Sequence, residues 1–255
     1  MKRLGIALSG GGARGAAHTG VLRVLSREGL PIHCIAGCSS GAIVGAFHAA
    51  GVPPEQQLQF AQRLRWRSLR MLGIPKMGFF HSGELERYII ETLGDKQFSD
   101  LKIPLQVVAT DFRTASPVVF KEGRVAPAVA ASAAIPIVFS PVRVGEMVLV
   151  DGGLTNNLPA DLARAMGAEV VLGVSVLSVF DDKRRFDSFF DIALGTMDLM
   201  SRHSTEIGRA LCDLCLAPLV GPRSPGDLAR APSMVAEGEA AMLRALPKLK
   251  ELMGA

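Results

Sequence analysis

The feature that most constrains the fold is a short apolar segment that ends in consecutive glycines and is followed by a helical pattern. Residues 3–8 predict a buried strand, which ends at Ser9 and the glycines at 10–12. Residues 13–28 then carry apolar side chains at helical spacing, and Gly29 is suited to end that helix. A strand, a glycine turn and a helix in this order are typical of the α/β class.

The same alternation recurs along the chain. Residues 33–37 predict a second strand, and residues 40–50 predict a helix of small residues that ends at Gly51. Segments rich in β-branched residues predict further strands at 105–109, 118–120, 147–150 and 170–176. We therefore expect an α/β fold with a mostly parallel sheet. Because no internal repeat or linker divides residues 1–255, we expect a single domain.

Composition excludes several classes of protein. With 255 residues, 49% of them hydrophobic and 20% charged, the chain is too apolar to be disordered and long enough to bury a core. Aromatic residues make up only 5%, which argues against base-stacking surfaces, so we expect no nucleic-acid partner. The Cys212-x-x-Cys215 spacing has no second pair of ligands beside it, so we expect no metal site.

The sequence leaves contact with a membrane surface open. No segment approaches the ~18 apolar residues of a membrane span, and the first apolar run is short for a secretory signal. We expect a cytoplasmic protein, with peripheral contact at the inner membrane surface as an alternative. Residues 63–76 are basic and, with Trp66, Phe79 and Phe80, fit either docking on anionic lipid or a solvated helix. Residues 180–200 fit either a lid or a surface helix.

The first glycine turn matches the pattern G-x-G-x-x-G at Gly10, Gly12 and Gly15. A dinucleotide site would also need an acidic residue at the end of the second strand, and residues 36–41 contain none. Two interpretations remain: a tight turn that serves only the backbone, or a cradle whose amides face a negatively charged oxygen. We expect no nucleotide cofactor.

A candidate nucleophile is Ser39, the centre of a G-x-S-x-G motif whose glycines are Gly37 and Gly41. The motif lies between a predicted strand and a predicted helix, which is the setting of a nucleophile elbow. The sharp turn leaves no room for bulky neighbours, and the hydroxyl is presented at a helix N-terminus that favours developing negative charge.

A candidate base is Asp151, which ends an apolar segment and is followed by Gly152 and Gly153. Its carboxylate would lie at the carboxyl edge of the sheet, where α/β proteins build their sites. Asp111, which follows another predicted strand, is the rival carboxylate. The alternative for Asp151 is an aspartate that only caps its own turn.

Together the three motifs supply a nucleophile, a base and an anion cradle, which is the equipment for acyl transfer. Histidine is the usual base, and only His203 follows Asp151 as the Ser-Asp-His order of α/β-hydrolases requires. No glycine or turn accompanies His203. A Ser39–Asp151 dyad is therefore favoured over a triad.

At this point the sequence resembles a known family. G-G-G-x-R-G at 10–15, G-x-S-x-G at 37–41 and D-G-G at 151–153 are similar, in that order, to the patatin-like phospholipases, most of all the short bacterial members and the catalytic domain of neuropathy target esterase. Residues 109–111 and 131–136 also look like the family. The resemblance covers about residues 2–159, and residues 160–255 show little of it.

The resemblance implies a three-layer α/β/α fold, no metal and no cofactor. It implies that Ser39 attacks an ester of a lipid, of phospholipase A or lysophospholipase type, to form an acyl-enzyme, and that Asp151 accepts the proton. The expected oxyanion hole consists of the amides of Gly10, Gly11, Gly12 and Ser40, and the motifs are supported by Arg14, Gly15, Gly37, Gly41, Gly152 and Gly153.

Several alternatives stay open at this stage. Arg14 is expected to fix the glycine turn, and the other interpretation is contact with a substrate phosphate. The rival functions are a non-catalytic regulatory or adaptor protein on the same scaffold and a short-chain esterase or thioesterase. Oligomeric state, acyl-chain length and the choice between phospholipid and lysophospholipid are not determined by these residues.

Overall fold

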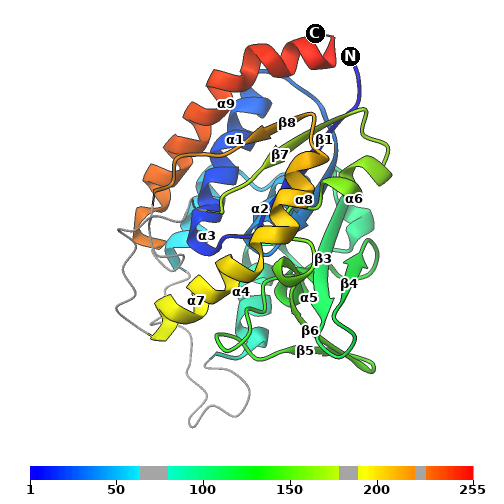
Figure 1. Ribbon diagram of the computed structural model, residues 1–255, viewed down its shortest axis with the longest axis vertical. Coiled ribbons are helices and arrows are strands. Elements are labelled where there is room, and N and C mark those ends of the chain that lie inside the picture. Colours follow the sequence, from blue (N-terminus) through cyan, green and yellow to red (C-terminus); the bar gives the residue numbers. More distant parts are fainter. Residues whose placement is uncertain (64–79, 178–188, 222–227, 255) are drawn as a thin grey trace.

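The computed structural model describes residues 1–63, 80–177, 189–221 and 228–254. In this part of the chain, eight strands form one mixed sheet in the order β5-β6-β3-β2-β1-β7-β8, with β4 also paired to β3 (Figure 1). β1, β2, β3, β7 and β8 are parallel, whereas β4 and β6 run antiparallel to β3, and β5 antiparallel to β6. The strands are β1 (Leu4–Leu8), β2 (Ile32–Cys38), β3 (Leu105–Asp111), β4 (Ser116–Phe120), β5 (Val142–Val144), β6 (Met147–Asp151), β7 (Val170–Val174) and β8 (Leu214–Leu216).

Helices cover both faces of the sheet, so the expected three-layer α/β/α arrangement is confirmed. The α-helices are α1 (Ala16–Arg27), α2 (Ser40–Ala50), α3 (Pro54–Arg63), α4 (Ser82–Leu93), α5 (Val125–Ser132), α6 (Ala160–Ala165), α7 (Phe189–Met200), α8 (Arg202–Ala210) and α9 (Ala231–Met253). Short 3-10 helices are η1 (Gly12–Gly15), η3 (Phe98–Asp100), η4 (Gly152–Leu154) and η5 (Leu228–Arg230). None of the described helices is both long and apolar enough to cross a membrane.

The two faces of the sheet differ in side-chain size. Leu4, Ile6 and Leu8 of β1 join the large apolar core beneath α1, α2 and α9, whereas Ala7 points to a smaller cluster with α6. On that second face a Cβ on Gly5 would lie 2.5 Å from the Cβ of Ala168. Small residues therefore let α6 pack close to the sheet, and the large ones build the core on the other side.

The strand predictions are right in number and place for six strands and miss two. β5 and β8, of three residues each, are too short to give a pattern in the sequence. The predicted strand at 170–176 ends at Val174, and the first helical pattern begins with η1 before α1. Of the basic segment 63–76, only Arg63 at the end of α3 lies within the described residues; of the 180–200 segment, α7 is described.

Residues beyond 160 add strands to the sheet and a long helix that packs on α1. β7 extends the sheet beside β1, and α9 packs along α1 with the chain ends close together at the top of the view (Figure 1). The two helices approach so closely that a Cβ on Gly20 would lie 2.0 Å from the carbonyl oxygen of Val235, and one on Gly238 would lie 2.0 Å from that of Ala17.

Candidate active site

Ser39 occupies the turn between β2 and α2 in a strained conformation. Its φ is +52°, in a region that L-residues rarely adopt. The turn depends on its two glycines: a Cβ on Gly37 would lie 2.7 Å from the Cα of Ala42, and one on Gly41 would lie 2.2 Å from the carbonyl oxygen of Leu8. The predicted elbow is therefore present, with α2 starting directly against β1.

A side chain from α5 holds this turn in place. The amide of Ser39 donates to Ser132 Oγ at 2.8 Å, and Ser132 Oγ in turn donates to the carbonyl oxygen of Val108 at 2.6 Å. One buried hydroxyl thus links the elbow to strand β3. Sequence reasoning included Ser132 in a family-like stretch but assigned it no role.

The carboxylate of Asp151 meets the Ser39 hydroxyl. Ser39 Oγ donates to Asp151 Oδ2 at 2.7 Å, and the amide of Gly153 donates to Oδ1 at 2.8 Å. Both side chains are buried. Burial disfavours the charged form and raises the pKa of Asp151 to about 6, against the two hydrogen bonds, which act to lower it.

Asp151 reaches this position by a route that the sequence did not predict. β6 is antiparallel to β3, so its end points away from the carboxyl edge of the parallel strands, where we expected it. Because Asp151 pairs with Ala109 while Cys38 pairs with Val108, the acid and the elbow still lie at the same level of the sheet. Gly152 permits this, since a Cβ there would lie 2.2 Å from the carbonyl oxygen of Val108.

Asp111, the other candidate carboxylate, binds groups of its own turn and of β6. Asp111 accepts hydrogen bonds from the amides of Arg113 and Val148 and from Thr114 Oγ1. Burial acts to raise the pKa of Asp111, but these hydrogen bonds outweigh it and hold the pKa below the usual value. Asp111 is therefore an aspartate that caps its own turn.

The histidines take other places. His203 is exposed on α8, and none of the hydrogen bonds described for Ser39 and Asp151 involves a histidine. His18 is fully buried, which lowers its pKa to about 4, and its Nε2 lies 2.8 Å from the carbonyl oxygen of Ser9. His18 thus braces the start of the glycine turn, in its neutral form at physiological pH.

The glycine turn lies beside Ser39 and is fixed by a buried arginine. Arg14 Nε donates to the carbonyl oxygen of Gly11 at 2.9 Å, and its guanidinium pairs with Asp198 of α7 at 2.5 Å. The guanidinium of Arg14 is fully buried and hydrogen-bonds to groups of the protein itself. This agrees with the interpretation that Arg14 fixes the glycine turn. Gly15 allows Ser40 to pack against η1, because a Cβ on Gly15 would lie 2.4 Å from that of Ser40.

The amides of the turn are not equivalent. The Gly10 amide donates to the carbonyl oxygen of Asn157 at 3.2 Å, so in this conformation it is already engaged. Asn157 is itself anchored, because its side-chain amide donates to Thr205 Oγ1 of α8 at 2.9 Å. Asn157 was missed by sequence reasoning, and only its place shortly after the D-G-G motif pointed to it.

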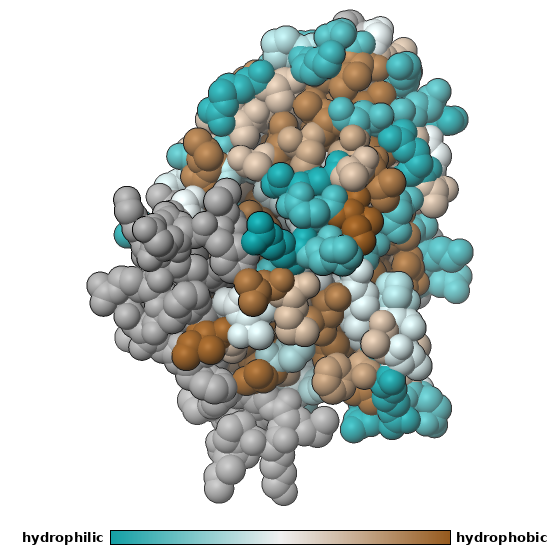
Figure 2. Space-filling model, viewed as in Figure 1, coloured by the Kyte–Doolittle hydropathy of each residue, from teal (hydrophilic) through white to brown (hydrophobic). Residues whose placement is uncertain are grey.

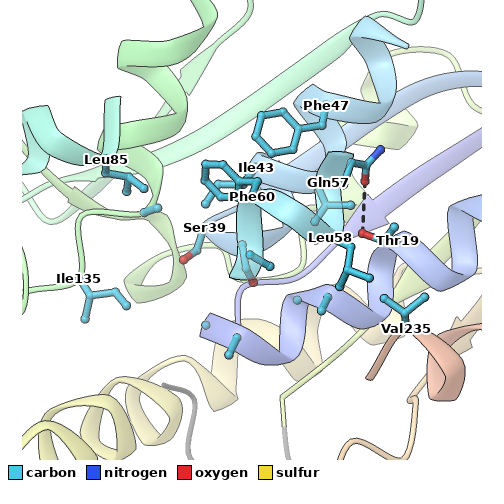
Figure 3. Close-up of a pocket in the computed structure, with 18 of the residues that line it drawn as sticks. Thr19, Ser39, Ile43, Phe47, Gln57, Leu58, Phe60, Leu85, Ile135 and Val235 are labelled. Atoms are coloured by element: carbon cyan, nitrogen blue, oxygen red, sulfur yellow. Dashed lines mark hydrogen bonds between the residues drawn. The ribbon is translucent and has the colours of Figure 1, made fainter. Parts of the chain in front are cut away.

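Ser39 lines two cavities. The larger encloses about 800 Å³ of empty volume, open to solvent in part, and its wall is almost wholly apolar. Figure 3 shows Ser39 towards one side of it and the hydrogen-bonded pair Thr19 and Gln57 towards the other. Residues lining this cavity include Ile43, Phe47, Leu58, Phe60, Leu85, Ile135, Phe139 and Val235.

The smaller cavity, of about 310 Å³, is on the side of the acid. It is lined by the glycines 10–12, Ser39, Asp151 and Asn157, and by α7 through Leu194, Met197 and Asp198. Ser39 thus lies between a large apolar chamber and a smaller, more polar one that is lined in part by the glycine turn.

Comparison with known proteins places the chain in a family. Residues 6–164 match the model of the patatin-like phospholipases, and this stretch contains Ser39 and Asp151. "Lysophospholipase nte1" of Aspergillus fumigatus is 33% identical over 187 residues, which are 71% of this chain and 12% of that protein. An uncharacterized NTE family protein of Mycobacterium tuberculosis is 36% identical over 177 residues, 68% of this chain and 49% of that protein. The chain therefore spans less than half the length of these relatives.

The fold also has counterparts among solved structures. VipD from Legionella pneumophila superimposes with a TM-score of 0.55 at 15% sequence identity, covering 97% of this chain and 67% of that one. ExoU of Pseudomonas aeruginosa, solved in complex with SpcU, gives a TM-score of 0.52 at 17% identity, with 100% of this chain and 52% of that one covered. These likenesses concern the fold, and they include the residues beyond 164.

Proposed function

Because this chain belongs to the patatin-like phospholipase family, we propose that it hydrolyses carboxylic esters of lipids, with Ser39 and Asp151 as a catalytic dyad. The observation that carries the proposal is the buried hydrogen bond of 2.7 Å from Ser39 Oγ to Asp151 Oδ2, at the side of a large apolar cavity. The name of the fungal relative, a lysophospholipase, supports the same class of substrate.

In the proposed reaction, Asp151 accepts the Ser39 proton as Ser39 Oγ attacks the ester carbonyl carbon. An ordinary aspartate is a weak base, but a pKa near 6 strengthens Asp151 and still leaves it ionised at neutral pH. The C–O bond to the alcohol then breaks, the alcohol leaves with the proton from Asp151, and an acyl-Ser39 remains. Water attacks this ester with Asp151 as base, which releases the fatty acid and restores Ser39.

The negative oxygen that forms during both attacks needs hydrogen-bond donors. We assign this role to the amides of Gly11, Gly12 and Ser40. The amide of Gly10 is left out because it already donates to the carbonyl oxygen of Asn157. Ser40 begins α2, so its amide has no partner within the helix. Loss of one such donor typically lowers the rate by ~10²–10³, so the geometry of the turn should matter nearly as much as the dyad.

The two cavities suggest how a lipid ester is divided. An acyl chain fits the larger, apolar cavity, and the alcohol part of the ester lies towards the smaller cavity beside Asp151. Short esters use the same dyad and leave most of the larger cavity empty. Apolar burial of the chain then favours long acyl groups over short ones.

The test compares fatty-acid release from lysophosphatidylcholine, phosphatidylcholine and a soluble short-chain ester. Ser39→Ala and Asp151→Asn should each lose at least about a thousandfold in kcat/KM, and His203→Ala should stay within about twofold of the wild type. Mass spectrometry after treatment with an alkyl fluorophosphonate should find the adduct on Ser39. Loss of activity in His203→Ala would replace the dyad by a triad. A wild-type protein that hydrolyses none of these esters would support the adaptor alternative.

A further inference from the structure

Helix α7 carries apolar side chains on two opposite faces. Its inner side, with Leu194 and Met197, lines the smaller cavity over the dyad. Its outer side exposes Ile192 (55%), Leu199 (59%) and Met200 (58%) to solvent. Thr196 is the remaining exposed side chain in the described part of α7 from residue 192 onward, so none of these exposed side chains is charged. Figure 2 shows hydrophobic side chains gathered over this helix.

Such a helix is unusual on a protein surface. Residues 192, 196 and 199 follow a spacing of four and three, so Ile192, Thr196 and Leu199 form one stripe that points outward. A surface helix normally presents charged side chains there, and an apolar patch of this kind marks a surface that contacts a partner or a membrane.

A strained and exposed isoleucine follows a residue that lines both cavities. Ile137 has φ +73°, a conformation that is costly for a β-branched residue, and it is 53% exposed. It comes two residues after Ile135, which lines both cavities next to Ser39. Backbone strain thus presents another apolar side chain to solvent, two residues along the chain from the wall of the cavities.

α7 is held at a fixed position relative to the reacting groups. Asp198, on its inner side, pairs with the buried Arg14, and Arg14 holds the carbonyl of Gly11 in the glycine turn. The outer stripe therefore has a defined orientation with respect to Ser39 and to the cavity beside it.

We propose that the outer stripe of α7 and the exposed Ile137 dock the protein on the surface of a lipid aggregate. The inference rests on the proposed function, because an ester with a long acyl chain resides in micelles or bilayers. The helix that carries the stripe also lines the smaller cavity with Leu194 and Met197. The stripe's lack of charge suits the boundary between headgroups and acyl chains of zwitterionic lipid.

Binding is measured with the Ser39→Ala protein, so that the vesicles are not consumed, by sedimentation with vesicles of phosphatidylcholine. Leu199→Ser and Ile192→Ser in this background should each weaken binding about tenfold. The matched control is Leu243→Ser, at a leucine of α9 that is 45% exposed and lines neither cavity. It should bind within about twofold of its parent, and circular dichroism should show all variants folded.

Three outcomes overturn the proposal: no vesicle binding by the parent, unchanged binding by the α7 variants, or an equal loss in Leu243→Ser. A dimeric parent that becomes monomeric in Leu199→Ser, with vesicle binding unchanged, assigns the stripe to contact between copies. In the active protein, the α7 variants should lose hydrolysis of vesicle lipid but keep kcat/KM for a soluble ester within about twofold. Absence of all ester hydrolysis would count against the proposed function alone, since the binding comparison does not depend on it.

Discussion

At the scale of single residues, Asp151 is held in a place that disfavours its own charge. Its carboxyl lies in the interior beside Ser39, where Oδ2 accepts a hydrogen bond from Ser39 Oγ. Oδ1 accepts from the Gly153 amide and, at 4.0 Å, from Cys38 Sγ. A carboxylate that many donors surrounded would have a low pKa and would be a poor base. Here the hydrogen bonds from Ser39 and Gly153 only partly offset the effect of burial on the pKa. The group is therefore charged at neutral pH and still basic enough to take a proton from a hydroxyl.

The first prediction concerns the pH dependence of turnover. Because the proposed base must be ionised, kcat/KM for a soluble ester should fall as pH drops below about 6, by roughly tenfold at pH 5. An aspartate with the ordinary pKa of ~3.9 would leave the rate unchanged over this range. A histidine could give a similar curve, so the profile is measured in His203→Ala as well, where the same acid limb should persist. An acid limb near pH 4 would contradict the assignment.

The second prediction concerns stability. The pKa of Asp151 is raised from 3.8 to about 6, so between pH 4 and 6 the unfolded chain ionises while the folded one keeps its proton, and stability falls as pH rises. Above pH 6 the loss is complete and amounts to about 3 kcal/mol. Asp151→Asn should therefore gain stability relative to wild type between pH 4 and 7 by this order, as measured by urea unfolding. If the difference in free energy of unfolding between the two proteins did not change with pH, burial would not raise the pKa of Asp151.

At the scale of elements, the elbow depends on three segments that meet: β2 with α2, strand β3, and the end of α5. Ser132 satisfies the Ser39 amide and the Val108 carbonyl with one hydroxyl. Gly37 and Gly41 only make room for the turn, whereas Ser132 fixes where it lies.

The third prediction follows from this link. Ser132→Ala leaves a buried amide and a buried carbonyl without a partner, so the free energy of unfolding should fall by about 1–3 kcal/mol. Turnover should fall by roughly tenfold to a hundredfold, because Ser39 is no longer held in register. Ser140→Ala is the control: Ser140 Oγ accepts from the Ser82 amide at 3.1 Å, and Ser140 takes no part in the hydrogen bonds described for Ser39 and Asp151. It should lose stability without losing turnover; equal kinetic losses in both variants would contradict the positioning role.

Elements also show where sequence reasoning succeeds. The elbow could be predicted because glycine, serine and a small-residue helix follow one another within a few positions, so local sterics decide the structure. The direction of β6 could not be predicted, because a short apolar segment has the same hydrophobic pattern in a parallel and in an antiparallel strand. Its pairing with β3, more than thirty residues away, decides the direction. The sequence therefore pointed to the carboxylate that hydrogen-bonds to Ser39, but for a reason that applies to a parallel strand.

At the scale of the whole molecule, the two ends of the chain are joined by the contact of α9 with α1. Val235 of α9 also lines the larger cavity, together with residues of α1 to α4. The sequence gives no sign of this wall, because it is assembled from residues up to about two hundred positions apart. Figure 1 shows α9 lying along α1 at one side of the molecule.

The fourth prediction tests this contact. A Cβ at position 238 would meet the carbonyl oxygen of Ala17 at 2.0 Å, and a backbone atom cannot rotate away. Gly238→Ala should therefore lower the free energy of unfolding by about 1–3 kcal/mol, despite the better helix propensity of alanine. Gly83→Ala is the control, since at that exposed position in α4 the new Cβ would meet only the His81 ring. It should stay within about 0.5 kcal/mol of wild type in chemical unfolding. A neutral Gly238→Ala would show that α9 can shift freely on α1.

The position of Ser39 between two unequal chambers has a consequence for chemical probes. A phosphonate whose phosphorus is attacked by Ser39 presents two substituents, and they would enter spaces of about 800 and 310 Å³. A reagent with one long alkyl arm and one compact arm should label the protein faster than its symmetrical isomer of equal carbon number. Labelling rates for a matched pair of this kind would reveal that the two spaces beside Ser39 are unequal, without any knowledge of the natural lipid.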